Sequence, residues 1–232
     1  NSISALCEST GADIREVSRA IGTDSRIGSK FLNSGPGFGG SCFKKDLLNL
    51  VYICNFYGLS EASSYWQKVF EINNWQQERI SKIIVEKLFG TLSGKSIAIL
   101  GFAFKANTND TRESPSINIC KNLLEEGAFL KIYDPKVSYD SIEKVFDKYQ
   151  NGSLNISNEM GKWFYSKTII DSCKNADAII VLTEWDEFMS INWDSVFEIM
   201  KKPAWLFDTR SITDIKKAKK AGLKVWRIGL GE

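Results

Sequence analysis

The spacing of hydrophobic positions changes near residue 91, and this change divides the sequence into two parts. Before it, apolar residues recur at three- and four-residue steps, which is typical of amphipathic helices. After it, short apolar runs alternate with helical stretches, which is typical of a parallel α/β sheet. We therefore expect a helical region at 1–90, followed by an α/β domain at 94–232.

Four helices are predicted in the first part. The chain is expected to begin inside one of them, because apolar residues at positions 3, 6 and 7 share a helical face and no capping residue precedes Asn1. Asp13 is a natural N-cap for the second helix, and Gly58 is a natural stop for the third. The second, third and fourth helices are expected at 14–21, 43–57 and 61–89.

The 61–89 helix is predicted to form an interface. Its apolar stripe runs the whole length of the helix, and Trp66, Phe70 and Trp75 widen it. One small domain does not cover so much apolar surface, so another surface should do so. We expect a homodimer through these central helices, and the state of any higher assembly stays open.

The second part is predicted to fold as a Rossmann-like parallel sheet. Its strands are expected at 96–100, 129–133, 178–182, 205–207 and 223–226, and its helices at 115–126, 168–174, 193–201 and 213–221. Such sheets bind ligands at the carboxyl ends of their strands, so residues 101–112 and 207–210 should border one crevice. The polar stretch 148–162 is interpreted as a surface loop or insertion.

Composition narrows the possible functions. The 232 residues include 30 basic and 28 acidic side chains, so the net charge of +2 creates no field that favours nucleic acid or an anionic membrane. No apolar run reaches the length of about 18 residues that crosses a bilayer. The absence of histidine excludes Ser-His and Cys-His pairs. The five cysteines form no CxxC pair, so we expect neither disulfides nor a zinc site but reduced thiols in a cytoplasmic protein.

One cysteine differs from the others in its surroundings. Cys42 stands where the glycine-rich loop 33–41 enters a helix, and helix N-termini and nearby cations such as Lys44 and Lys45 stabilise thiolates. Asp46 follows one helical turn later, so its carboxylate shares a face with the thiol. A small buried apolar residue is the alternative role for Cys42. The other four cysteines are expected to pack on apolar faces.

The loop itself contains the pattern G-x-G-x-x-G at 35–40. A dinucleotide site needs a strand before this pattern and an acidic residue about 20 positions later at a strand end, and neither is present here. We therefore reject a dinucleotide fingerprint. The glycines instead allow the backbone to approach a ligand closely and to expose its N–H groups.

Three cations follow strands of the second part. Lys105 lies in the first βα loop, which is a plausible anion site. Arg112 either binds phosphate or pairs with Asp110 or Glu113, and pairing is favoured. Arg210 has the planar fork that suits a phosphate or a pair of hydroxyls, with an ordinary surface arginine as the alternative.

These residues lie in segments that resemble the UDP-glucose/GDP-mannose dehydrogenase family. The matching segments are FLNSGPGFGGSCFKKDLLNLVYIC, IAILGFAFKANTNDTRESPS, IYDPKV, VLTEWDEF and FDTRSITD. The resemblance covers nearly all of the chain in order, and residues 49–52 favour the UDP-glucose branch. The resemblance implies that the 94–232 domain binds a UDP-sugar, and that the full enzyme oxidises UDP-glucose to UDP-glucuronate with two NAD molecules.

The resemblance also implies roles for individual residues. Cys42 would be the nucleophile that forms a thiohemiacetal and then a thioester, and Asp46 would assist the hydrolysis by water. Arg26 would be donated to the neighbouring subunit's site. The substrate contacts would be Phe31, Asn33, Gly35, Pro36, Gly37, Phe38, Gly39, Phe104, Lys105 and Arg210, and Phe43, Lys44, Lys45 and Arg112 would lie near NAD.

The sequence departs from the family pattern in three ways. The strand-helix unit that carries the family's own G-x-G-x-x-G is missing, and so is its lysine and asparagine pair that stabilises oxyanion charge. Asn33 stands where many relatives have lysine. We therefore expect a fragment that has no dehydrogenase activity alone. The alternatives are a UDP-sugar-binding and dimerisation module without catalysis, and a sibling enzyme acting on UDP-N-acetylmannosamine or GDP-mannose.

Overall fold

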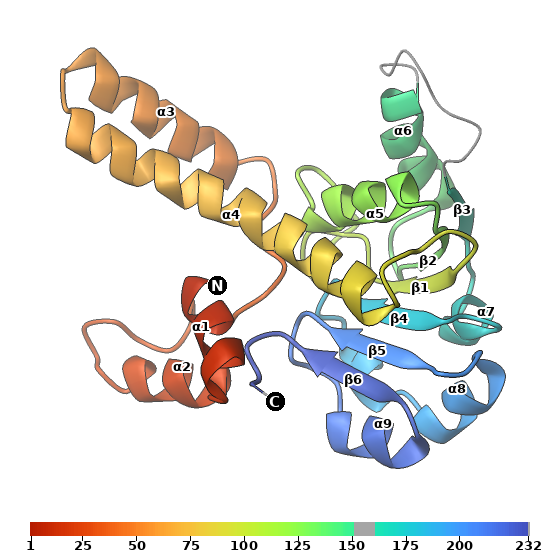
Figure 1. Ribbon diagram of the computed structural model, residues 1–232. Helices are drawn as coiled ribbons and strands as arrows, with labels where there is room; N and C mark the ends of the chain where they lie inside the picture. The colour runs from red at the N-terminus through yellow and green to blue at the C-terminus, as the bar shows by residue number, and fades with distance from the viewer. Residues whose placement is uncertain (151–160, 232) are drawn as a thin grey trace.

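Helices form the first part of the chain and a six-stranded sheet forms the second, as Figure 1 shows. The computed structural model describes residues 1–150 and 161–231. The first part contains α1 (Ser2–Thr10), α2 (Ile14–Gly22), α3 (Phe43–Phe56) and α4 (Ser60–Lys87). The second, third and fourth predicted helices are therefore confirmed, with ends that differ by one or two residues. The expected helix at the start of the chain is also present, with Asn1 at its N-cap position.

Local chemistry explains where these helices begin and end. The Asp13 side chain caps α2 by accepting a hydrogen bond from the Arg15 N–H. Gly58 adopts a φ of 72°, a left-handed conformation that suits glycine, and this turns the chain from α3 into α4. Helices α3 and α4 then pack side by side as a hairpin that projects away from the sheet (Figure 1).

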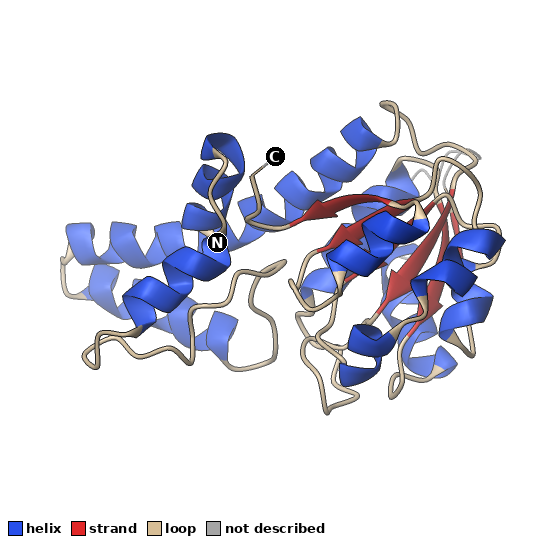
Figure 2. Ribbon diagram, turned by 90° about the horizontal axis from the view of Figure 1, so that it is seen from below, coloured by secondary structure: helices blue, strands red, loops and turns tan. Residues whose placement is uncertain are grey.

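All neighbouring strands of the sheet are parallel, in the order β3-β2-β1-β4-β5-β6. The strands are β1 (Ser96–Leu100), β2 (Phe129–Tyr133), β3 (Lys162–Tyr165), β4 (Ala178–Val181), β5 (Trp205–Asp208) and β6 (Lys224–Arg227). Helices flank the sheet (Figure 2): α5 (Pro115–Glu125), α6 (Tyr139–Gln150), α7 (Ile169–Cys173), the 3-10 turn η1 (Asp186–Ser190), α8 (Trp193–Ile199) and α9 (Ile215–Ala221). The strand order is that of a doubly wound Rossmann-like sheet, which confirms the predicted fold class.

The central strands provide the core. Residues 97–100 of β1 and 178–181 of β4 are fully buried, as expected for strands covered on both faces. The end of α4 joins the same core through Ile80 and Ile84. The long helix therefore belongs to both parts of the molecule.

The prediction was wrong between residues 139 and 165. Residues 139–150 form α6, which had not been predicted, and 162–165 form the edge strand β3. The expected loop at 148–162 is therefore helix at its start and strand at its end, and 151–160 lie outside the described residues. The polar composition of this stretch hid the aromatic β-forming run Trp163-Phe164-Tyr165.

Ion pairs and backbone bonds tie the first helices to the sheet. Arg79 of α4 and Glu8 of α1 form an ion pair at 2.8 Å, and the Gly229 N–H donates to the same carboxylate at 2.7 Å. Asp13 Oδ2 forms an ion pair with Arg227 Nη2 of β6 at 3.4 Å. Across the ranges 1–150 and 161–231, no helix has the length and apolar character that a membrane crossing needs.

Candidate functional site

A cleft of about 690 Å³ lies between the first helices, the 30–39 loop and the carboxyl ends of β1 and β5. Phe104 and Lys105 contribute from the loop after β1, and Arg210 contributes from the segment after β5. The Arg210 guanidinium donates to the Phe104 carbonyl at 3.4 Å, so these two loops meet as the strand pattern predicted. The cleft is large enough for a nucleotide-sized ligand.

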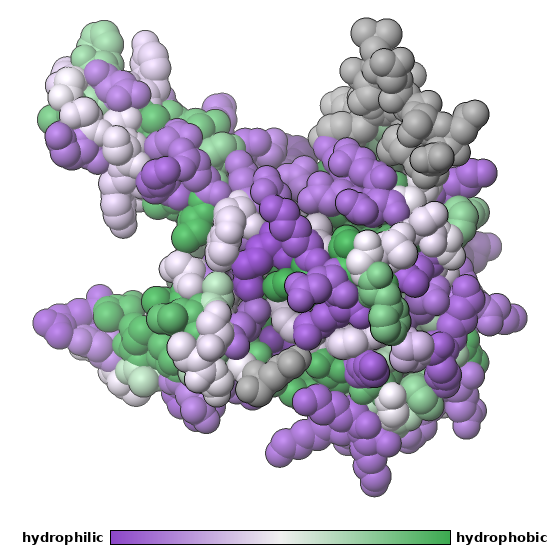
Figure 3. Space-filling view, in the orientation of Figure 1, coloured by the Kyte–Doolittle hydropathy of each residue, from purple (hydrophilic) through white to green (hydrophobic). Residues whose placement is uncertain are grey.

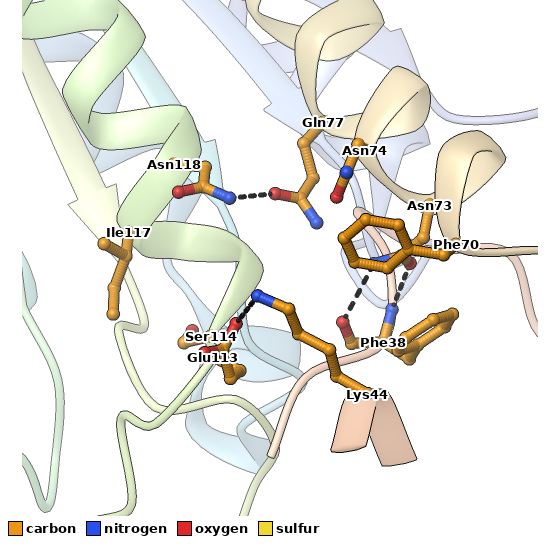
Figure 4. A pocket seen from close by; sticks show the side chains of 10 residues that line it. All are labelled: Phe38, Lys44, Phe70, Asn73, Asn74, Gln77, Glu113, Ser114, Ile117 and Asn118. Carbon is orange, nitrogen blue, oxygen red and sulfur yellow. Dashed lines mark hydrogen bonds and ion pairs between the residues drawn. The ribbon is translucent and has the colours of Figure 1, made fainter. Parts of the chain in front are cut away.

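The glycine-rich loop also lines the cleft and is held by side-chain amides of α4. Asn73 Oδ1 accepts from the Phe38 N–H at 2.8 Å, and Asn73 Nδ2 donates to the Phe38 carbonyl at 3.3 Å (Figure 4). Gln76 Nε2 donates to the Gly35 carbonyl at 3.0 Å, and the Gly35 N–H donates to Asn1 Oδ1 at 2.9 Å. The backbone of the loop is thus fixed by residues outside it.

The end of the loop rests on the segment before α5. The Gly40 N–H donates to the Arg112 carbonyl at 3.0 Å. A Cβ added at Gly39 would lie 2.4 Å from the Glu113 carbonyl oxygen, so no larger residue fits there without movement of the backbone. Close approach of two backbones therefore explains this glycine.

Cys42 is the N-cap residue of α3, directly beyond this contact. Of the five thiols it alone is exposed, whereas Cys7, Cys54, Cys120 and Cys173 are buried, as predicted. Asp46 is also exposed, and its N–H donates to the Cys42 carbonyl at 2.9 Å, which places the carboxylate one turn along the helix. The small-and-buried alternative for Cys42 is therefore wrong.

The cations near Cys42 are mostly engaged with carboxylates. Lys44 pairs with Glu113 at 2.7 Å (Figure 4), and Arg112 pairs with Asp110 at 2.8 Å. The bond to Asp110 is the main cause that raises the pKa of Arg112, and the charge of Cys42 raises it further. Arg112 therefore lies within electrostatic reach of the thiol.

Arg210 is held in place where it lines the cleft. Its Nε donates to the Leu182 carbonyl at 2.8 Å, and its Nη1 lies 3.0 Å from Glu184 Oε2. Burial lowers the pKa of Arg210, and the Glu184 carboxylate opposes this effect. Arg210 is therefore a fixed, mostly buried guanidinium that lines the cleft, and not a free surface arginine.

Not every predicted site residue lines the cleft. Phe31, Asn33, Gly35, Gly37, Phe38, Gly39, Phe43, Phe104, Lys105 and Arg210 do. Pro36 is buried within the loop and does not line the cleft. Cys42, Asp46 and Lys45 are exposed, and they are also not among the lining residues. Arg26 pairs with Asp24 at 2.6 Å, and its side chain is 87% exposed, away from the cleft.

Sequence reasoning missed the supporting residues Asn1, Asn73, Gln76 and Glu184. The signal for the α4 pair was available, because amides at 73, 76 and 77 interrupt the apolar stripe of the helix. Buried amides need hydrogen-bond partners, and the partner here is the loop. No comparable signal marked Asn1 or Glu184.

A second, smaller cavity of about 80 Å³ lies behind the loop, between α4 and the start of α5. Figure 4 shows its polar lining, in which Gln77 Oε1 accepts from Asn118 Nδ2 at 2.8 Å. Phe38 borders both this cavity and the cleft. The loop therefore separates the two spaces, and of these two only the cleft is large enough for a ligand.

The described residues of the site could contact only one side of a bound dinucleotide. In the described ranges, the G-x-G-x-x-G pattern at 35–40 follows a loop and not a strand, and the βα loop at 101–105 lacks the glycine spacing. Exposed Lys45 and the exposed side chain of Arg112 are the cations beside Cys42 that could face such a ligand. Within the same ranges, no group of three or more acidic or cysteine side chains could hold a metal ion.

Two family models match the chain. The UDP binding domain of the UDP-glucose/GDP-mannose dehydrogenase family matches residues 98–215, and the central domain of the same family matches residues 1–75. UDP-glucose 6-dehydrogenase 4 of Arabidopsis thaliana is 49% identical over 99% of this chain and 49% of its own length. UDP-glucose 6-dehydrogenase of Drosophila melanogaster is 48% identical over 99% of this chain and 48% of its own length. The chain thus spans about half the length of these curated relatives.

Solved structures agree with the fold. A UDP-glucose dehydrogenase from Pyrobaculum islandicum is similar with a TM-score of 0.75 and 27% identity, over 100% of this chain and 47% of that chain. An NDP-N-acetyl-D-galactosaminuronic acid dehydrogenase from Methanosarcina mazei gives a TM-score of 0.75 at 22% identity, over 98% and 46% of the two chains. The second likeness concerns the fold alone.

Proposed function

Because the chain belongs to the UDP-glucose/GDP-mannose dehydrogenase family, we propose that it supplies the nucleophilic cysteine and the UDP-sugar cleft of an NAD-dependent UDP-glucose 6-dehydrogenase. The observation that carries this proposal is the position of Cys42. Of the five thiols it alone is exposed. It lies at a helix N-terminus, beside the loop that lines the cleft. The proposed domains are 1–90, with the cysteine loop and the dimer helices, and 94–232, with the UDP-sugar site.

The nucleotide half of the substrate would lie against the sheet. Lys105 and Arg210 place two cations at the carboxyl ends of β1 and β5, and these suit a diphosphate. Phe104 adds an aromatic face from the same loop. Phe31, Asn33 and the backbone of 35–39 would contact the ligand from the glycine-rich loop, within which Pro36 is buried.

The chemistry assigned to this chain is covalent. Sγ of Cys42 would bond to the aldehyde carbon of the partly oxidised sugar, and the resulting oxygen would take a proton to give a thiohemiacetal. After oxidation the same carbon is held as a thioester, which water cleaves to a carboxylate while the thiolate leaves. Asp46, one turn along the helix, would orient that water or accept its proton. Splitting one oxidation into covalent steps is the physical reason for a thiolate here.

NAD, when bound, supplies the hydride acceptor for this oxidation. In this chain Phe43, Lys44, Lys45 and Arg112 would lie beside it, and Arg112 is already within electrostatic reach of Cys42. No strand–G-x-G-x-x-G–helix unit occurs in the described residues. We therefore expect the 232-residue polypeptide by itself to produce no NADH from UDP-glucose.

Two observations favour UDP-glucose over the other candidate functions. The relatives at 49% and 48% identity are named UDP-glucose 6-dehydrogenases, which argues against a sibling substrate such as UDP-N-acetylmannosamine or GDP-mannose. Cys42, Asp46, Lys105 and Arg210 are all present. Their joint presence argues against a module that binds UDP-sugar without turnover.

A dimer through α3 and α4 is part of the proposal. Figure 3 shows hydrophobic side chains on this hairpin and over α1 and α2. The exposed residues include Tyr52, Phe56, Tyr57 and Tyr65. Arg26, exposed on the loop after α2, would reach the site of the second subunit. Five unpaired cysteines fit a reducing compartment such as the cytoplasm.

The test is Cys42→Ser in the full-length protein, with Cys54→Ser in the same helix as the control for a conservative change at a buried thiol. We expect Cys42→Ser to reduce formation of the sugar acid by about 10⁴-fold or more, as for other lost nucleophiles. The dissociation constant for UDP-glucose should stay within about threefold, because the nucleotide contacts lie on the sheet side of the cleft. Steady-state NADH production and calorimetry measure the two quantities. Loss of binding in parallel with turnover would make Cys42 structural and would refute the proposal.

A further inference from the structure

The buried amide of Asn73 makes a two-point contact with the loop that leads to Cys42. Its Oδ1 accepts from the Phe38 N–H at 2.8 Å and its Nδ2 donates to the Phe38 carbonyl at 3.3 Å (Figure 4). One amide thus satisfies both backbone groups of one residue, and only one orientation of the amide does so. Asn73 is 6% exposed, so water does not replace these bonds without movement of the loop.

The loop is shaped to receive this amide. Gly37 has a φ of 133°, and a Cβ there would lie 2.7 Å from Asn73 Oδ1. Any side chain at position 37 would therefore push the amide away from Phe38. Gln76, one turn further along α4, holds the Gly35 carbonyl through one donated bond at 3.0 Å.

Phe38 connects the Asn73 contact to the start of α3, where Cys42 lies. Its ring packs edge-to-face on the ring of Phe43, with centroids 4.5 Å apart. Phe43 is the first residue of α3, and Cys42 is the N-cap directly before it. Two glycines separate Phe38 from Ser41, and the second is held by the Arg112 carbonyl. The path of the chain into Cys42 is therefore set at two points, Phe38 and Gly40.

We propose that Asn73 is a positioning residue, which fixes Phe38 so that Sγ of Cys42 is presented at the edge of the cleft. This inference rests on the proposed function, since it assigns a role to the loop that carries the nucleophile. Asn73 itself lines the cavity behind the loop and not the cleft, so it acts through Phe38 and not on the substrate.

The test uses Asn73→Ala, Asn73→Asp and the matched control Asn74→Ala in the full-length protein. Asn74 is the next residue on α4 and lines the same cavity, and it makes no hydrogen bond to the loop. Asn73→Asp keeps the size and the acceptor for the Phe38 N–H but loses the donor to the Phe38 carbonyl. It is also the variant that keeps the test decisive if Asn73→Ala does not fold.

We expect Asn73→Ala to lower kcat at saturating UDP-glucose by about 100-fold, which is the scale of a misplaced reacting group. Asn73→Asp should fall between Asn73→Ala and the wild type, and Asn74→Ala should stay within about twofold. Affinity for UDP alone should change by less than about threefold in all three, because Lys105 and Arg210 come from the loops after β1 and β5 and Asn73 holds neither of them. This split between turnover and nucleotide binding is what a general loss of structure does not produce.

Two results would overturn the inference. One is a kcat for folded Asn73→Asp or Asn73→Ala that equals that of Asn74→Ala. The other is a parallel loss of UDP affinity and kcat, which would make the amide a structural element of the whole cleft. If Cys42→Ser abolishes turnover while the Asn73 variants remain fully active, only this inference fails. If Cys42→Ser retains turnover, the proposed function itself fails.

Discussion

The sheet and the α3–α4 hairpin bury their apolar side chains in different ways. In β1 and β4, residues 97–100 and 178–181 have no solvent exposure, because helices flank the sheet. In the hairpin, Phe56 is 73% exposed and Tyr65 is 64% exposed. The sheet completes its own core within one chain, whereas the hairpin leaves large apolar side chains exposed.

This difference separates stability from assembly. Substitutions in the sheet should lower the free energy of unfolding of the single chain. Substitutions on the outer face of the hairpin should change association and leave the fold of the single chain nearly unchanged. Charged residues where the first helices meet β6 should have the smallest effects, because their contacts are few and partly exposed.

The largest effect is expected for Ile99→Ala in β1. Ile99 is fully buried, so the substitution removes apolar contacts and leaves a cavity, at a cost of about 2–5 kcal/mol in the free energy of unfolding. Urea denaturation followed by circular dichroism measures it. The control is Ile53→Ala in α3, where the side chain is 42% exposed and the cost should be below about 1 kcal/mol. Equal costs at both positions would erase the distinction between the two regions.

An intermediate effect is expected for the double substitution Tyr65→Ser and Ile72→Ser on α4. Both side chains are exposed and lie seven residues apart, on one helical face. If this face forms the dimer, the two losses should weaken it by about 2 kcal/mol or more, which is about 30-fold in the dissociation constant. Light scattering across a concentration series measures the change. Ile170→Ser, at an exposed position of α7, is the control, and a dimer equally stable in both proteins would place the interface elsewhere.

The smallest effect is expected for Asp13→Asn, where the first helices meet β6. The hydrogen bond from Arg15 is the main cause that lowers the pKa of Asp13, and the charge of Arg227 adds to it. A carboxyl with a lowered pKa in the folded state stabilises the fold above its ordinary pKa of 3.8 and loses this contribution as the pH falls through its folded value. The contribution should be about 1 kcal/mol or less, since Arg15 is half exposed and solvent screens the pair. Unfolding free energies at pH 6 and pH 3 should therefore differ less in the variant than in the wild type, and an identical difference would contradict the assignment.

Sequence patterns predicted the elements whose apolar period was clean. The spacing in 61–89 gave α4 to within two residues, and the run Ile97-Ala98-Ile99-Leu100 gave β1. Helix α6 and strand β3 were missed because their polar residues and the neighbouring polar stretch concealed the pattern. Strand β3 lies at the sheet edge, and its residues alternate between exposed and half-buried. Its hydrophobic pattern in the sequence is therefore weaker than that of β1.

The candidate site was predictable where one residue type carries the chemistry. Cys42 followed from its place between a glycine loop and a helix, and Arg210 followed from its place after a strand. The environment of these residues was not predictable, because it depends on contacts between distant segments. The bond from Arg210 to the Leu182 carbonyl and the amide of Asn73 on Phe38 each join positions at least 28 apart in the chain.

Helix α4 has a mechanical consequence for the whole molecule. It is 28 residues long, which corresponds to about 42 Å of continuous helix. Its C-terminal end packs in the sheet core through Ile80 and Ile84. Its middle binds the glycine-rich loop through Asn73, and Tyr65 lies near its N-terminal end. A stiff rod fixed at one end moves its tip by about 4 Å for a tilt of about 5°. A tilt of α4 would therefore also displace Asn73 and, through its bonds to Phe38, the segment that precedes the thiol.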